Sequence, residues 1–213
     1  MLLASSITGP QAIFATVAHR LFLLRHGQTE WSVNGRHTGR TDIPLTPAGE
    51  GQARAAGGTL RAVLGGSPAL VLSSPRTRAQ RTAELAGLRV DEVTEELAEW
   101  DYGDYEGITT PVIRETVPGW TVWTHPIPGG ESAEDVNSRA DKLIDRVREP
   151  LGKGDVILVG HGHFSRVLVA RWIGLPSTAG VHFGLDPAGV AVLGDERGEP
   201  QIEHLNLLPT AED

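Results

Sequence analysis

Three short polar segments of this sequence each follow directly on an apolar run. They are Arg25-His26-Gly27, Ser74-Pro75-Arg76 and His161-Gly162-His163. Two imidazoles and two guanidiniums around one point would form an anion site, and arginine suits phosphate because it donates two parallel hydrogen bonds. The two histidines could instead bind a metal ion, but neighbouring arginines repel a cation, so we expect no metal. If the three segments meet, the sequence predicts a phosphate site.

Strands are needed to bring these segments together. Short apolar runs, typical of strands buried on both faces of a sheet, predict strands at residues 21–24, 69–72 and 155–160. Further short strands are expected at residues 90–97, 189–193 and 201–205. Apolar residues at helical spacing predict helices at residues 47–64, 77–86, 132–148 and 164–172. This alternation indicates an α/β fold, a three-layer α/β/α sandwich with a mostly parallel central sheet. The carboxyl ends of parallel strands share one edge, so we expect the polar segments to converge there.

The segments between these elements carry their own signals. Thr46 is a good N-cap, Pro47 fits the first helical position, and Glu50 is expected to complete a capping box. Residues 28–44, rich in Gly, Thr and Asn, predict a loop. Residues 109–130, rich in Pro and Trp, predict a short helix and a loop that cover the mouth of the site.

Three arginines crowd the start of the helix predicted at residues 77–86. Arg76, Arg78 and Arg81 oppose the helix dipole, which favours anions at that end. An anion bound between them would account for the arrangement. Alternatively, Arg78 and Arg81 are solvated or pair with Glu84.

The composition is that of an ordinary globular protein of 213 residues, 39% apolar and 22% charged. The net charge of −8 argues against nucleic acid and an anionic membrane as partners. The absence of cysteine excludes thiol nucleophiles and thiolate metal sites. Residues 1–19 predict a flexible extension, and residues 20–213 a single domain. Because no apolar run is long enough to span a membrane, we expect a cytoplasmic protein, with a homodimer as the commonest assembly.

Five motifs occur in order between residues 21 and 170. They are Arg25-His26-Gly27-Gln28-Thr29-Glu30-Trp31 with Thr38-Gly39 and Asp42-Ile43-Pro44-Leu45-Thr46; Ser74-Pro75-Arg76-Thr77-Arg78-Ala79; Glu99 with Tyr102-Gly103-Asp104-Tyr105-Glu106-Gly107; Gly129-Gly130-Glu131-Ser132; and His161-Gly162. In these motifs the sequence resembles the histidine phosphatase superfamily, also called phosphoglycerate mutase-like. The resemblance implies that family's α/β/α fold and phosphoryl transfer without a cofactor.

The resemblance also implies a role for each matching residue. His26 would be the nucleophile that forms a phosphohistidine, and Arg25, Arg76 and His161 would bind the phosphoryl oxygens. Glu99 would protonate the leaving oxygen and then activate water, helped by a nearby phosphate that favours its protonated form. His26 must be neutral at its attacking nitrogen, and a backbone carbonyl on the other nitrogen would fix that tautomer.

The motifs also bear on the division between mutases and phosphatases within the family. Ser32 stands where familiar phosphoglycerate mutases carry Asn, and Glu99-Trp100-Asp101-Tyr102-Gly103 replaces their Glu-Arg-His-Tyr-Gly. The sequence looks most like fungal sedoheptulose-1,7-bisphosphatases and actinobacterial acid phosphatases. We therefore predict a metal-independent phosphatase for small phosphate monoesters, such as sugar phosphates. A phosphoglycerate mutase and a non-catalytic phospho-ligand binding module are the alternatives.

Side-chain identity does not name the substrate beyond a small phosphorylated metabolite. Motif residues around His26 are expected to bind it: Gly27, Gln28, Trp31, Ser32, Thr38, Gly39, Tyr102 and Gly162. Further candidates for the outer pocket are His37, Arg40, Trp123 and His163. Local alternatives to Glu99 as the acid are Glu95, Glu96 and Glu106.

Overall fold

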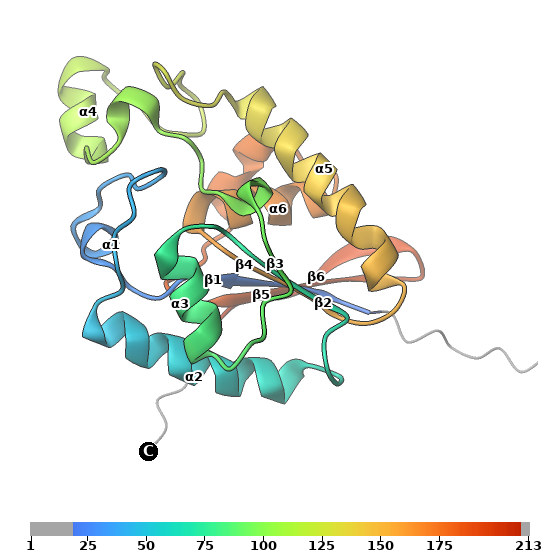
Figure 1. Ribbon diagram of the computed structural model, residues 1–213. Helices are drawn as coiled ribbons and strands as arrows, with labels where there is room; N and C mark the ends of the chain where they lie inside the picture. Colours follow the sequence, from blue (N-terminus) through green and yellow to red (C-terminus); the bar gives the residue numbers. More distant parts are fainter. Residues whose placement is uncertain (1–18, 210–213) are drawn as a thin grey trace, which may run out of the picture.

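A six-stranded sheet forms the centre of the computed structural model, which describes residues 19–209 (Figure 1). Its strands, in the spatial order β3-β2-β4-β1-β5-β6, are β1 (Leu21–Arg25), β2 (Leu70–Ser73), β3 (Glu92–Val93), β4 (Val156–Gly160), β5 (Val190–Glu196) and β6 (Glu199–Leu207). The strands from β3 to β1 pair in parallel, whereas β5 and β6 pair antiparallel. The prediction of a mostly parallel sheet is confirmed.

Helices cover both faces of this sheet. One face packs on α2 (Pro47–Val63) and α3 (Thr77–Leu85), and the other on α5 (Ala133–Leu151) and α6 (Gly162–Trp172) (Figure 1). The side chains of β1 alternate between the two cores, because Phe22 belongs to the α2 and α3 side and Leu23 to the α5 and α6 side. All four apolar residues of β1 are 0% exposed. This is the predicted three-layer α/β/α sandwich.

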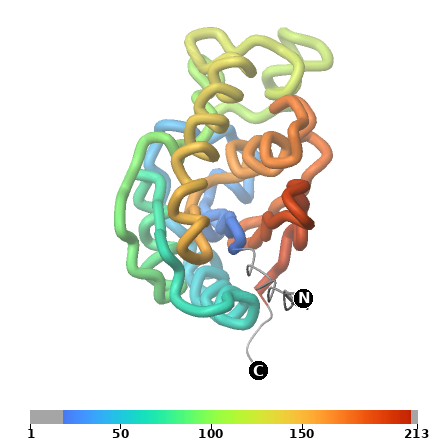
Figure 2. Tube along the Cα trace, turned by 90° about the vertical axis from the view of Figure 1, so that its right-hand side faces the viewer, coloured from blue at the N-terminus to red at the C-terminus, as the bar shows by residue number. Residues whose placement is uncertain are grey.

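The remaining helical segments lie in the connections. They are α1 (Glu30–Asn34), α4 (Thr110–Thr116) and three 3₁₀ turns, η1 (Glu95–Leu97), η2 (Gly103–Tyr105) and η3 (Ser177–His182). Figure 1 shows α1 and α4 on the side toward which β1 points. In Figure 2 the segment from about residue 100 to 130, green to yellow, gathers at one end of the molecule. The helix predicted within residues 109–130 is confirmed as α4.

Three local predictions are wrong. The loop predicted at residues 28–44 contains α1, which starts with a capping box between Thr29 and Ser32. In α2, Thr46 caps the Gly49 N–H as N-cap, but Gly49 holds the third helical position, so the Glu50 carboxylate binds Arg54 and Arg81 instead of closing a box. The strand predicted at residues 90–97 is only the two-residue β3, because the next residue, Thr94, is already the N-cap of η1.

The extension predicted at residues 1–19 lies outside the described residues, apart from His19. No helix among residues 19–209 is long and apolar enough to cross a membrane.

Candidate active site

The three polar segments meet at the carboxyl edge of the sheet. Arg25 pairs in register with Gly160 of β4, so His26 and His161 both follow directly on neighbouring strands. Their imidazole rings lie 5.2 Å apart between centroids in an edge-to-face arrangement. Ser74 follows β2, on the other side of β4. The parallel pairing of β1, β4 and β2 therefore brings the predicted histidines together.

His26 is buried, and a hydrogen bond to the adjacent backbone holds its ring. Nδ1 lies 2.7 Å from the carbonyl oxygen of Gly27, to which it donates. This is the backbone partner expected from the sequence, and it leaves the Nε2 lone pair free. Burial lowers the pKa of His26 well below its usual value, and the charges of Arg78 and Arg25 lower it further. His26 is therefore a neutral imidazole at neutral pH.

His161 and Arg25 each carry a buried polar atom without a hydrogen-bond partner among residues 19–209. His161 Nε2 lies 2.6 Å from the Ser74 hydroxyl, while its Nδ1 has no partner. Arg25 donates from Nη1 to the carbonyl oxygen of Leu185 at 2.6 Å, while its Nε has none. Burial lowers the pKa of both groups, and the charge of Arg78 adds to the effect on His161. Unpaired buried polar atoms at the ends of two neighbouring strands fit a site that binds a polar ligand.

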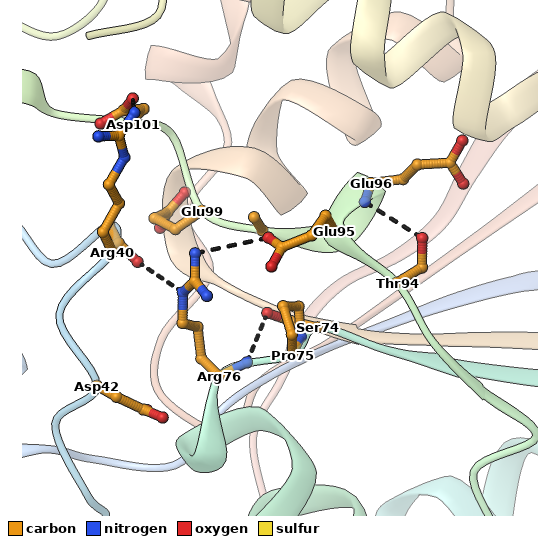
Figure 3. Close-up of polar contacts among 12 residues, drawn as sticks. Arg40, Asp42, Ser74, Pro75, Arg76, Thr94, Glu95, Glu96, Glu99 and Asp101 are labelled. Atoms are coloured by element: carbon orange, nitrogen blue, oxygen red, sulfur yellow. Dashed lines mark hydrogen bonds and ion pairs between the residues drawn. The ribbon is translucent and has the colours of Figure 1, made fainter. Parts of the chain in front are cut away.

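Arg76 is turned toward two neighbouring loops. Its Nε donates to the carbonyl oxygen of Gly39 at 3.3 Å, and its Nη2 lies 3.6 Å from a carboxylate oxygen of Glu95. Figure 3 shows the guanidinium between the chain at Arg40 and the Glu95 side chain, with Glu99 on the following segment. The Glu95 side chain is 72% exposed, so water competes strongly for this ion pair.

Arg78 and Arg81, the other two arginines near the start of α3, differ completely in their exposure to solvent. Arg78 is fully buried and donates to the carbonyl oxygens of Thr38, Gly39 and Thr41. Arg81 lies at the surface, where it pairs with Glu84 and Glu50. An anion between these arginines is therefore not needed to explain Arg81, whose charge is matched by carboxylates.

The Glu99 carboxylate caps the N-terminus of α6. Oε1 accepts hydrogen bonds from the backbone N–H groups of Trp100 and Phe164, both at 2.8 Å, and Oε2 accepts one from His163 at 2.9 Å. Glu99 is 7% exposed and reaches the same cavity as His26. Two of the alternative acids lie outside the cavity lining. The Glu106 carboxylate accepts hydrogen bonds from the backbone of Gly39, and the Glu95 side chain is largely exposed.

A cavity of about 410 Å³ opens above His26, within the size range of sites for small metabolites. Of the residues predicted for catalysis or substrate binding, those that line the cavity are Arg25, His26, Trp31, Ser32, Thr38, Glu99, Tyr102 and Gly162. The outer-pocket candidates His37, Trp123 and His163 line it too, whereas Arg40 instead ion-pairs with Asp101. Arg76 and His161 are not part of the lining.

Three predicted substrate-binding residues are not part of the lining either, because they serve local packing. A Cβ on Gly27 would lie 2.3 Å from the carbonyl oxygen of Gly49, so the glycine allows β1 and α2 to approach closely. The Gln28 side chain accepts a hydrogen bond from the Thr46 hydroxyl at 2.9 Å. The carbonyl of Gly39 accepts from Arg76 and its N–H donates to Glu106.

Several lining residues were not expected from the sequence. They are Thr29, Gly35, Arg36, Thr110, Arg114, Thr121, Val122, Arg166 and Val181. Spacing offered a signal for one of them, because Arg166 lies four residues after the predicted site residue Gly162 on α6. A residue one helical turn beyond a site residue lies on the same face of the helix.

Tyr102 and His163 form a neutral hydrogen-bonded pair in the wall of the cavity. The Tyr102 hydroxyl lies 2.6 Å from Nδ1 of His163. Burial raises the pKa of Tyr102 well above its usual value and lowers the pKa of His163 well below its usual value. The described residues contain no group of three or more His, Asp or Glu side chains arranged to hold a metal ion.

The chain is similar to several known proteins. A family model described as the histidine phosphatase superfamily (branch 1) matches residues 21–208. An acid phosphatase of Mycobacterium tuberculosis is 50% identical over 189 residues, covering 89% of this chain and 93% of that protein. A sedoheptulose 1,7-bisphosphatase of Saccharomyces cerevisiae is 35% identical over 185 residues, covering 73% of this chain and 68% of that protein.

A solved structure of an open reading frame from Mycobacterium tuberculosis shares the fold. It superposes with a TM-score of 0.87 at 50% sequence identity, over 90% of this chain and 99% of that chain. On the family match, the identities and the shared fold, the chain belongs to the histidine phosphatase superfamily.

Proposed function

We propose that this protein is a metal-independent phosphatase that hydrolyses small phosphate monoesters through a phosphohistidine on His26. Family membership and phosphatase relatives support the phosphatase activity. The observation that carries the mechanism is the hydrogen bond from His26 Nδ1 to the Gly27 carbonyl, 2.7 Å long, in a site that holds unpaired donors. It leaves a neutral nucleophilic nitrogen facing the cavity.

In the first step His26 Nε2 attacks the phosphorus atom and the ester P–O bond breaks. The lowered pKa of His26 supports this role, because a protonated imidazole has no lone pair to attack with. The ring needs no reorientation, since Gly27 already holds Nδ1. A fixed nucleophile lowers the entropic cost of reaching the transition state.

Arg25 and His161 are assigned to the phosphoryl oxygens. The buried Nε of Arg25 is a donor that lacks a partner within the described chain. If the Ser74 hydroxyl donates to His161 Nε2, the proton of the neutral ring sits on Nδ1, which then becomes a second unpaired donor. Arg76 would join them by releasing the exposed Glu95 carboxylate. Preformed donors of this kind stabilise the charge that spreads over the phosphoryl group in the transition state.

Glu99 is assigned the proton transfers. It would protonate the leaving oxygen in the first step, and in the second deprotonate a water that attacks phosphorus and breaks the P–N bond. Its place in the cavity wall supports the assignment. Its oxygens accept three backbone hydrogen bonds, so the acid role requires a carboxyl proton directed into the cavity when substrate is bound.

The residues that depart from the mutase pattern support hydrolysis over phosphoryl transfer back to the substrate. Trp100 is 1% exposed and donates from its indole N–H to the Glu131 carbonyl, while Asp101 pairs with Arg40. Neither residue lines the cavity. The Ser32 hydroxyl donates within the cap of α1, to the carbonyl oxygen of Thr29. Trp100 and Asp101 therefore add no substrate ligand at the positions where the mutase sequence has Arg and His. A cytoplasmic location and a homodimer stay predictions.

The proposal is tested by phosphate release from p-nitrophenyl phosphate at pH 5 to 7 with a chelator present. We expect turnover by the wild-type protein, loss of at least about a thousandfold in His26→Ala because the nucleophile is gone, and near wild-type activity in His125→Ala, an imidazole outside the cavity. No turnover by the wild type would refute the phosphatase. Conversion of 3-phosphoglycerate to 2-phosphoglycerate without phosphate release would instead identify a mutase.

A further inference from the structure

The Arg139 side chain, on α5, binds the backbone of the segment that carries Glu99. Its Nη1 donates to the carbonyl oxygens of Glu96 and Ala98 at 3.1 and 2.7 Å, and its Nη2 donates to that of Glu99 at 3.4 Å. Three carbonyl groups within one short segment therefore accept hydrogen bonds from a single side chain. Because a guanidinium is planar and its donors point in fixed directions, these bonds set the path of the backbone that leads into Glu99.

The Glu131 carboxylate fixes Arg139 in this position and holds the chain that follows Glu99. It accepts from Nε and Nη2 of Arg139 at 2.9 and 2.8 Å, so every N–H group of the guanidinium has an acceptor. One carboxylate oxygen also accepts from the backbone N–H of Asp101, and the Glu131 carbonyl accepts from the indole N–H of Trp100, both at 2.9 Å. The paired side chains are only 17% and 22% exposed, and a bidentate pair of this kind is stronger than an ordinary surface ion pair.

Arg139 also packs on the residue that binds the Glu99 carboxylate. Its guanidinium carbon lies 3.9 Å from the ring centroid of the buried Phe164 on α6, which covers the same face of the sheet as α5 (Figure 1). The backbone N–H of Phe164 donates to Glu99 Oε1 at 2.8 Å. A cation over the face of an aromatic ring is attracted to it, so each side chain stabilises the position of the other. One arginine therefore contacts both the backbone of Glu99 and the residue that holds its carboxylate.

Glu99 depends on such contacts because its own segment is irregular. Residues 98–102 form neither helix nor strand, so no ladder of regular backbone hydrogen bonds holds them. Proton transfer needs the donor and the acceptor within hydrogen-bond reach, and a displacement of about 1 Å can cost roughly a hundredfold in rate. An acid on an irregular segment therefore needs rigid support from elsewhere in the fold.

We propose that Arg139, held by Glu131, is the positioning residue for Glu99 and sets the distance between its carboxyl group and the leaving oxygen of the substrate. Neither Arg139 nor Glu131 lines the cavity, so both act through Glu99. The inference rests on the proposed function, in which Glu99 transfers the proton. It makes that transfer depend on a side chain of α5 outside the site.

Two esters that differ in the basicity of the leaving group test the proposal. Benzyl phosphate releases an alkoxide that must be protonated as it departs, whereas p-nitrophenolate departs without an acid. For both esters kcat/KM covers the steps up to transfer of the phosphoryl group to His26, so hydrolysis of the intermediate does not enter. The ratio of kcat/KM for benzyl phosphate to kcat/KM for p-nitrophenyl phosphate, measured at one pH, therefore reports the acid.

Variants of the ion pair should change this ratio. Arg139→Met should lower it roughly tenfold, part of the ~10²–10⁴-fold that a positioned acid contributes, while kcat/KM for p-nitrophenyl phosphate changes much less. Arg139→Lys keeps the charge but replaces the planar fork by a single nitrogen, so it should lower the ratio by a smaller factor. Glu99→Gln has no acid and should lower the ratio most. If Arg139→Met fails to fold, Glu131→Gln decides alone, because it removes the ion pair and should lower the ratio severalfold.

Arg146→Met is the matched control. Arg146 lies about two turns after Arg139 on α5. Its side chain pairs with Glu92 and Glu96, on the segment that leads to Glu99, but within the described chain it makes no hydrogen bond to Glu99 itself. We expect Arg146→Met to lower the thermal stability of the protein and to leave the ratio unchanged.

The outcomes separate this inference from the proposed function. If Glu99→Gln lowers the ratio but Arg139→Met lowers both kcat/KM values equally, Arg139 contributes only to folding and the positioning role is overturned. A ratio that falls as far in Arg146→Met as in Arg139→Met also overturns it. A ratio unchanged in Glu99→Gln would instead refute Glu99 as the acid, and no phosphate release from either ester by the wild type would refute the phosphatase itself.

Discussion

The Ser74 hydroxyl lies 2.6 Å from Nε2 of His161, and both side chains are fully buried. A hydroxyl that donates to Nε2 fixes the tautomer with the proton on Nδ1, the nitrogen without a partner in the described structure. With Ser74 as the donor, the residue that follows β2 determines which nitrogen of His161, at the end of β4, carries the hydrogen. In the proposed mechanism the Ser-Pro-Arg motif therefore acts through its serine as well as through Arg76.

Ser74→Ala should lower kcat/KM for a phosphate monoester by roughly tenfold, because His161 loses the partner that orients its donor. Ser73→Ala is the matched control, since this buried hydroxyl donates to the Ser74 carbonyl and does not touch His161. Steady-state kinetics on both variants, with circular dichroism to verify folding, checks the prediction. Equal losses in the two variants would mean that the serine contributes only packing.

Arg78→Met should both destabilise the protein and change the pH profile. Three carbonyl oxygens would lose their buried donor, at a cost of about 3 kcal/mol in the free energy of unfolding. Because the charge of Arg78 lowers the pKa of His26, its removal raises that pKa, and the acid limb of kcat/KM should move to higher pH. Arg81→Met, three residues along the same helix, should leave the acid limb in place. An unchanged limb in Arg78→Met would contradict this electrostatic role.

His37 should make the protein less stable in acid. Burial lowers its pKa from 6.5 to about 4, so between these values the unfolded chain binds a proton that the folded protein does not. Stability from this group is complete above pH 6.5 and falls as the pH drops toward 4, by ~3 kcal/mol in all. Denaturant unfolding at pH 7 and 4.5 should show a smaller pH effect in His37→Gln than in the wild type. The same pH effect in both proteins would show that His37 is not responsible.

Two glycines of α2 should respond oppositely to alanine. A Cβ on Gly49 would lie 2.1 Å from the Gln28 carbonyl oxygen, so Gly49→Ala must push the chain after His26 away and lower both stability and activity. Gly51 has nothing within 4 Å of its Cβ position, so Gly51→Ala should stabilise the helix by about 0.5–1 kcal/mol. Thermal unfolding distinguishes them, and a stabilised Gly49→Ala would be the contrary result.

The parts of the fold that the sequence predicted are those set by local patterns. Apolar runs marked the central strands, and because parallel strands end at one edge, the meeting of His26 and His161 followed from their positions alone. The five residues of α1 gave too short a pattern to recognise. The capping box predicted at Glu50 does not form, because a capping box needs the third helical residue and that residue is Gly49.

The burial and contacts of several residues depend on tertiary packing and could not be predicted from local sequence patterns. Arg78 and Arg81 are three residues apart on α3, and no feature of the sequence shows that one is buried beneath residues 38–41 and the other exposed. Gly27 and Gln28 belong to the motif around His26, yet their contacts are with α2. Arg166 and Arg114 line the cavity. Which face of α6 and α4 is turned toward the cavity depends on how these helices pack.

Direct detection of the covalent intermediate tests the mechanism most directly. The protein would be mixed with p-nitrophenyl phosphate, quenched rapidly in alkali and examined by mass spectrometry of the intact chain and its peptides. Because an aryl leaving group departs without an acid, Glu99→Gln should form the intermediate normally and hydrolyse it slowly. We predict a gain of one phosphoryl group on His26, larger in Glu99→Gln and absent in His26→Ala. Turnover without phosphorylated His26, or a phosphoryl group on another residue, would contradict the account.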